Sequence, residues 1–129
     1  LKYKNGFQHG LQKKYYEGGQ IQEESEYNNG LRHGFAKWYS INRHIVAEFQ
    51  YEQGKLEGDQ NYYYPNGNIS KHETLKNNIL HGNYEEYYET GTTKLSGKYI
   101  NGLKEGTWTE LDENGKIIKE TKYSKDKAK

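Results

Sequence analysis

The chain has 129 residues, a formal net charge of +1, only 31% hydrophobic residues and a mean hydropathy of −1.31. This composition excludes an ordinary globule with a large aliphatic core, but 14 Tyr, 2 Trp and 3 Phe are too many for a disordered polar chain. A nearly neutral charge gives little attraction to nucleic acid or to an anionic membrane, and the lack of cysteine excludes disulfides and zinc–thiolate sites.

A period of 24 residues runs through the sequence. Starting from Tyr3, the pattern returns at Tyr27, Tyr51, Leu75, Tyr99 and Tyr123, without insertion or deletion. We therefore divide this single domain, residues 1–129, into the repeats 3–26, 27–50, 51–74, 75–98 and 99–122, with a partial repeat and charged tail at 123–129. Because the chain begins part-way through the pattern without an initiator Met, we expect a fragment of a longer protein.

Each repeat is predicted to contain two strands and two turns. The eighth position is always glycine, and the fourth is glycine except at Asn78. Asn-Gly pairs supply the positive φ angles of tight turns, and Asn is the mildest substitute for glycine there. The seventeenth position is also glycine, except at Arg43.

Between the turns, segments such as 45–51 and 69–75 roughly alternate polar and apolar residues, and no segment has a helical period. In chain order, the second strands begin at Ile21, Ile45, Ile69, Thr93 and Ile117. The pattern predicts an all-β fold: an elongated, open and curved single antiparallel meander of stacked 24-residue β-hairpin repeats, with ladders of equivalent tyrosines.

Two segments carry the clearest copy of the repeat signature, Tyr-x-Asn-Gly-x-x-x-Gly. They are residues 27–34 and 99–106. The signature resembles the MORN repeat, in particular the variant class common in bacterial proteins. The resemblance implies a curved β-sheet that serves as a binding platform. It also implies protein–protein contacts, phospholipid binding in some eukaryotic members, and an antitoxin role in some bacterial members.

Three histidines share one place in the repeat. His9, His33 and His81 occupy the seventh position, just before the recurrent glycine. Equivalent positions in successive repeats lie two strands, or about 10 Å, apart. Zinc ligands lie only ~2.1 Å from the metal, so we expect turn residues and predict no metal site.

Carboxylates gather in two places. The groups are Glu85, Glu86 and Glu89, and then Glu110, Asp112 and Glu113. Paired carboxylates can hydrolyse glycosides, but these are expected on a solvated strand without a pocket. No Ser-His-Asp arrangement, phosphate-binding loop or metal motif appears, so we predict no catalytic residue, no cofactor and no enzymatic activity.

Some large aromatic residues do not recur between repeats. Core positions should recur, so these departures are the candidate partner-binding residues. At positions ten and twelve they are Trp38, Tyr62, Tyr84 and Trp108, and alternation places Tyr16, Tyr64 and Tyr88 on the same strand face. Such a strip has the composition of an interaction hot spot. The alternative is that these rings pack inward as ordinary core, and a bulge near the glycine would reverse the parity.

The leading hypothesis is a non-enzymatic repeat scaffold that binds another protein through an aromatic-rich sheet face. One alternative is an antitoxin or inhibitor that neutralises a partner protein. Another is a cell-surface or envelope module that binds carbohydrate, lipid or host protein. Membrane lipid is the less favoured partner because cations do not recur from repeat to repeat, and nucleic acid is not expected. Both the bacterial cytoplasm and the cell envelope or exterior fit the composition.

Overall fold

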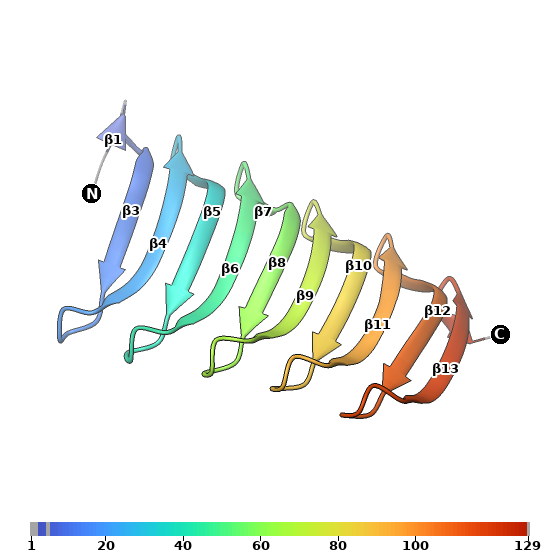
Figure 1. The fold of residues 1–129 in the computed structure, drawn as a ribbon. Coiled ribbons are helices and arrows are strands. Elements are labelled where there is room, and N and C mark those ends of the chain that lie inside the picture. The colour runs from blue at the N-terminus through green and yellow to red at the C-terminus, as the bar shows by residue number, and fades with distance from the viewer. Residues whose placement is uncertain (1–2, 5, 129) are drawn as a thin grey trace.

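The computed structural model describes residues 3–4 and 6–128, and all regular structure in this part of the chain is β (Figure 1). The strands are β1 (Tyr3–Lys4), β2 (Phe7–Gln8), β3 (Gly10–Tyr15), β4 (Ile21–Asn28), β5 (Leu31–Tyr39), β6 (Ile45–Glu52), β7 (Lys55–Leu56), β8 (Gly58–Tyr63), β9 (Ile69–Lys76), β10 (Ile79–Tyr87), β11 (Thr93–Ile100), β12 (Leu103–Leu111), β13 (Ile117–Ser124) and β14 (Lys127–Ala128). The predicted all-β fold is confirmed.

Twelve strands form one antiparallel sheet whose order follows the chain. The order from the far end is β14-β13-β12-β11-β10-β9-β8-β6-β5-β4-β3, and β7 pairs with the end of β6. The short strands β1 and β2 form a separate pair at the N-terminal end. Figure 1 shows the strands in a single row, with the first and last strands at opposite ends. The predicted open meander is therefore also confirmed.

The turns along one edge of the sheet are two-residue turns with positive φ at both central residues, which defines type I′. In the turn between β4 and β5, Asn29 has φ 51° and Gly30 has φ 82°. In the turn between β9 and β10, Asn78 retains this backbone with φ 70°. The Asn78 side chain also accepts a hydrogen bond of 2.7 Å from the backbone N–H of Leu56 in the previous repeat. Asparagine therefore adds an inter-repeat contact that glycine lacks.

The turns along the other edge have five residues between the paired strand ends, such as Tyr15 and Ile21. The Gly19 N–H donates to the carbonyl of Tyr16 at 2.9 Å, and Gly19 has φ 93°. In the second repeat Arg43 stands at this position with φ 68°, and its N–H donates to the carbonyl of Ser40. The same turn therefore forms with arginine in place of glycine at the seventeenth position.

In the second to fifth repeats, a bulge or interruption follows the type I′ turn. Across β4 and β5, Ser25 pairs with Ala36 and Tyr27 pairs with Arg32, so three residues of β5 face one residue of β4. The recurrent glycine, Gly34, lies in this bulge with φ 101°. In the third repeat the same interruption separates β7 from β8.

Directly paired residues of an antiparallel sheet share a face, so the strand register assigns the two faces. The first face, which we call the aromatic face, has two neighbouring rows. One row is Glu23, Trp38, Ala47, Tyr62, Lys71, Glu86, Leu95, Glu110 and Lys119. The other consists of Gln12, Ser25, Ala36 and Phe49, then Gln60, Glu73, Tyr84 and Gly97, then Trp108 and Thr121.

The second face, which we call the polar face, carries a continuous row of charged and polar residues. They are Lys13, Glu24, Lys37, Glu48, Asn61, His72, Glu85, Ser96, Thr109 and Glu120. The buried hydrophobic residues among those described, Ala36, Ala47, Leu75 and Trp108, include three from the rows of the aromatic face. The core of this single-layer sheet is thus on one side only.

Candidate binding face

The N-terminal half of the aromatic face is built around Phe49. Its ring centroid lies 5.0 Å from that of Trp38 and 5.2 Å from that of Tyr62. The small residues Ala36 and Ala47 lie beside these rings and are buried beneath them. All three rings remain half-buried, because no second layer of the described chain covers this face.

The C-terminal half is built around Trp108. Its ring lies 5.0 Å from Tyr99, 5.6 Å from Tyr84 and 6.3 Å from Tyr123, between ring centroids. The Trp108 indole N–H donates to the carbonyl of Lys98 at 3.2 Å. Trp108 is only 4% exposed, so this ring is core.

Gly97 explains why one repeat can carry the Trp108 ring. A Cβ at Gly97 would overlap the indole, which covers the backbone at this point. Other repeats carry larger residues at the same position, including Phe49 and Thr121. A large residue on one strand is therefore matched by a small one on its neighbour.

Arg32 occupies a cage of three rings on the same face. Its guanidinium carbon lies 5.6 Å from the ring centroid of Tyr27 and 5.7 Å from those of Trp38 and Tyr51. Stacking a guanidinium on aromatic faces is favourable through the ring quadrupole. In the last complete repeat Lys104 lies in the same way, 5.1 Å from Trp108 and 5.0 Å from Tyr123.

The equivalent tyrosines do not stack directly on one another, which corrects the predicted ladder. Tyr27 and Tyr51 are separated by Arg32, and Tyr99 and Tyr123 are separated by Trp108. The reason is geometric, because two strands intervene between equivalent positions and leave about 10 Å to be filled.

Glu23 anchors the Arg32 cage. Arg32 donates to the Glu23 carboxylate at 2.7 Å, and the Ser25 hydroxyl donates to the same oxygen at 2.6 Å. Burial alone would raise the pKa of Glu23, but the hydrogen bonds from Ser25 and Arg32 hold it below its usual range. Burial alone would lower the pKa of Arg32, but the hydrogen bond to the Glu23 carboxylate and its negative charge raise that pKa.

This ion pair was not predicted from the sequence. The signal that could have found it is a paired replacement, because the next repeat carries Ala47 and Leu56 at the positions of Glu23 and Arg32. Phe49 was missed for a similar reason, since it stands where other repeats carry small or polar residues.

The seven candidate aromatic residues separate into two sets. Trp38, Tyr62, Tyr84 and Trp108 lie together on the aromatic face, with Trp108 buried and the other three half-buried. Tyr16, Tyr64 and Tyr88 lie one residue beyond the ends of β3, β8 and β10. Alternation fails to place them, because a register shift precedes the last residue of each strand.

The hydroxyls of these last three tyrosines connect successive repeats. Each donates to the backbone carbonyl that lies 23 residues further on, at 2.6 to 2.7 Å. The acceptors are the carbonyls of Tyr39, Tyr87 and Leu111. The structure therefore gives Tyr16, Tyr64 and Tyr88 a part in holding the stack together.

The polar face has tyrosine–glutamate pairs between strands. The Tyr39 hydroxyl on β5 donates to Glu24 on β4 at 2.8 Å, and the Tyr63 hydroxyl on β8 donates to Glu48 on β6. Burial, reinforced by these hydrogen bonds, raises the pKa of Tyr39 and of Tyr63 to about 12. Salt bridges between Lys and Glu side chains cross the same strands.

Two of the in-register histidines, His33 and His81, lie on β5 and β10 rather than in a turn as expected, and each accepts a hydrogen bond from the turn of the next repeat. The backbone N–H of Gln53 donates to Nδ1 of His33 at 3.2 Å, and that of Asn101 donates to Nδ1 of His81 at 3.1 Å. Glu105 accepts from Lys125 in the same way. Among the described residues, no three His, Cys, Asp or Glu side chains are grouped so as to hold a metal ion.

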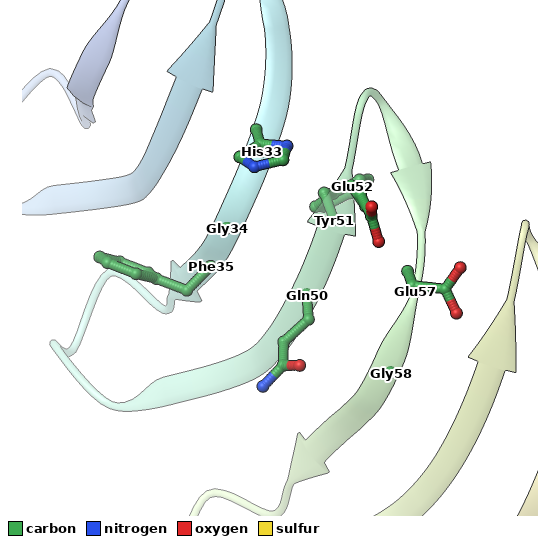
Figure 2. A pocket seen from close by; sticks show the side chains of 8 residues that line it. All are labelled: His33, Gly34, Phe35, Gln50, Tyr51, Glu52, Glu57 and Gly58. Carbon is green, nitrogen blue, oxygen red and sulfur yellow. The ribbon is translucent and has the colours of Figure 1, made fainter.

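A hollow of about 550 Å³ opens between the second and third repeats. Figure 2 shows it beside β5 and β6, with the carboxylates of Glu52 and Glu57 near its rim and Tyr51 between them and His33. His33 already accepts the Gln53 N–H, and Glu52 is exposed to solvent. The hollow is therefore a depression of the surface in which His33 and Glu52 are not held together as an acid–base pair.

The indel-free stack of β-hairpins and its one-sided aromatic core define a β-repeat protein. The MORN repeat variant family matches residues 8–29, 56–77, 80–101 and 104–125, which is more than half of the chain. The chain therefore belongs to the MORN repeat variant family. No curated protein matches it.

The matches leave out residues 30–55, which contain the turn Ser40-Ile41-Asn42-Arg43. The structure has the same hairpin there, so the repeat continues in three dimensions where the family pattern is weakest. Within the described residues, no helix is long and apolar enough to cross a membrane.

Proposed function

We propose that the protein is a non-enzymatic scaffold that binds another protein along the aromatic face. The observation that carries this proposal is the half-buried cluster of Trp38, Phe49 and Tyr62 on a sheet face without a covering layer in the described chain. Aromatic residues presented in this way are enriched at the energetic centres of protein interfaces. Repeat sheets of this kind offer an elongated surface that a partner covers.

The cations of this face favour a protein partner over a membrane. Arg32 and Lys104 hold their charges against aromatic rings, and Arg32 is also paired with Glu23. A surface that binds anionic lipid presents several free cations side by side. Glu73, Glu86 and Glu110 on the same face would oppose such binding. An inhibitory role toward the partner would use the same surface.

Site-specific cross-linking tests the proposal. A photoreactive phenylalanine analogue is placed at Tyr62 on the aromatic face or at the neighbouring Asn61 on the polar face. We expect a discrete protein adduct in extracts of the source cells from position 62 and none from position 61. The same adduct from both positions, or none from position 62, would contradict binding through the aromatic face.

A further inference from the structure

A recurring tyrosine joins successive repeats at the edge of the sheet that carries the longer turns. In the first, third and fourth repeats, the residue at position fourteen is Tyr16, Tyr64 or Tyr88, and its hydroxyl donates to the next repeat at 2.6 to 2.7 Å. The Tyr88 ring lies 5.7 Å from the Lys94 ammonium, so this ring also approaches position twenty of its own repeat. Each tyrosine thus bridges the turn of its own repeat and the end of the equivalent strand in the next repeat.

The second repeat has Ser40 at this position, and a cavity of about 260 Å³ lies there. We call this cavity the Ser40 slot. It is lined mostly by apolar surface from Ser40, Asn42, His44, Ile45, Val46, Tyr63 and Pro65. A shift of 24 residues superimposes these residues on Tyr16 and its surroundings, so the slot is the place that a tyrosine occupies at the other junctions.

The Ser40 slot contains a backbone acceptor. The Tyr63 carbonyl is the counterpart of the carbonyls of Tyr39, Tyr87 and Leu111, each of which receives a tyrosine hydroxyl. No side chain of the described residues donates to the Tyr63 carbonyl. The Ser40 hydroxyl does not reach across, because it accepts the His44 N–H at 3.3 Å within its own turn.

We propose that the Ser40 slot binds one phenol ring, supplied by a tyrosine side chain of a protein partner. The ring lies against Ile45, Val46 and Pro65, and its hydroxyl donates to the Tyr63 carbonyl. At about 260 Å³ the slot is smaller than the ~300 Å³ at which pockets for drug-sized ligands begin, so it suits a single ring.

The rim of the slot favours a protein as the source of the ring. Ile41 is 57% exposed and Val46 is 43% exposed, and both lie in or beside the turn that borders the slot. A bound chain would cover these apolar side chains, whereas a free phenol would leave them in water. The inference rests on the proposed function only in taking the partner to be a protein, since the slot lies at the turn edge and not among the rings of the aromatic face.

Nuclear magnetic resonance titration of the full chain tests the slot. The probes are N-acetyl-tyrosinamide, N-acetyl-phenylalaninamide and p-cresol, and the signals are the methyl groups of Ile41, Ile45 and Val46. We expect saturable shifts with the tyrosine probe, weaker shifts with the phenylalanine probe, and p-cresol binding no tighter than the tyrosine probe. No saturable shift, or equal shifts from the tyrosine and phenylalanine probes, would overturn the proposal. Tighter binding of p-cresol would overturn the assignment to a protein tyrosine.

Three of the other repeats indicate which variant should fill the slot, because they carry tyrosine at the position of Ser40. Ser40→Tyr copies three other repeats, so we expect it to fold, to raise the melting temperature and to abolish the shifts by filling the slot. Ser40→Ala keeps the slot empty and should bind the tyrosine probe like wild type. Undiminished binding by a folded Ser40→Tyr variant would overturn the proposal. Trp38→Ala should leave probe binding unchanged, so failure of the slot and failure of the aromatic face are distinguishable.

Discussion

At the scale of single residues, the aromatic face is held together by compensation between neighbours. Trp108 fits because Gly97 beneath it has no side chain, and Trp38 fits beside two buried alanines. The expectation that core positions must recur is therefore too strict. A core residue can be larger in one repeat than in the others when its cross-strand neighbour in that repeat is smaller.

The ion pair of Glu23 and Arg32 gives a direct test of such compensation. Arg32→Leu leaves the buried Glu23 carboxylate without its nearest cation, and we expect it to lower the free energy of unfolding by about 2 kcal/mol. The double variant Glu23→Ala/Arg32→Leu copies Ala47 and Leu56 of the next repeat and should recover most of that loss. Urea denaturation measures both changes. Equal instability of the single and double variants would show that the pair is not the unit of compensation.

The acid dependence of the same pair has a definite sign. The pKa of Glu23 is lower in the folded protein than the ordinary glutamate value of 4.5, so its contribution is complete above pH 4.5 and is lost as the pH falls through the folded pKa. The stability of wild type relative to the double variant should accordingly decline below pH 4.5.

At the scale of elements, tyrosine–glutamate pairs couple adjacent strands of the polar face. The pKa of Tyr39 and of Tyr63 is raised from 10.0 to about 12, so the folded state retains protons that the unfolded state releases. Their contribution is complete below pH 10 and is lost progressively as the pH rises towards 12.

We expect the melting temperature to fall across this alkaline range, with phenolate absorbance appearing at unfolding. Circular dichroism and phenolate absorbance, followed on the same samples, measure the two events. The Tyr39→Phe/Tyr63→Phe variant should show a smaller decline. An undiminished decline in that variant would assign the effect to other groups.

The elements themselves were predictable because their causes are local. Asn-Gly pairs specify type I′ turns, and a constant period of 24 residues forces equivalent strands into the same register. The face of Trp38 and Tyr62 also followed from alternation. Tyr16 and its equivalents could not be placed in this way, because the register shift at Tyr15 ends the alternation one residue before them.

At the scale of the whole molecule, the fold is a single curved layer with two unlike faces. Five repeats at ~4.8 Å per strand span about 50 Å, which is enough for an extended contact with another protein. The polar face satisfies its charges in cross-strand pairs, whereas the aromatic face leaves half-buried rings without a covering layer in the described chain. The difference between the faces is the basis of the proposed function.

The affinity of the cross-linked partner for two neighbouring variants tests this claim most directly. Isothermal titration calorimetry would compare Tyr62→Ala, on the aromatic face, with Asn61→Ala, on the polar face, after circular dichroism has shown both to be folded. Binding through the aromatic face predicts a loss of affinity of about tenfold or more for Tyr62→Ala and wild-type affinity for Asn61→Ala. Equal affinities, or a loss confined to Asn61→Ala, would contradict it.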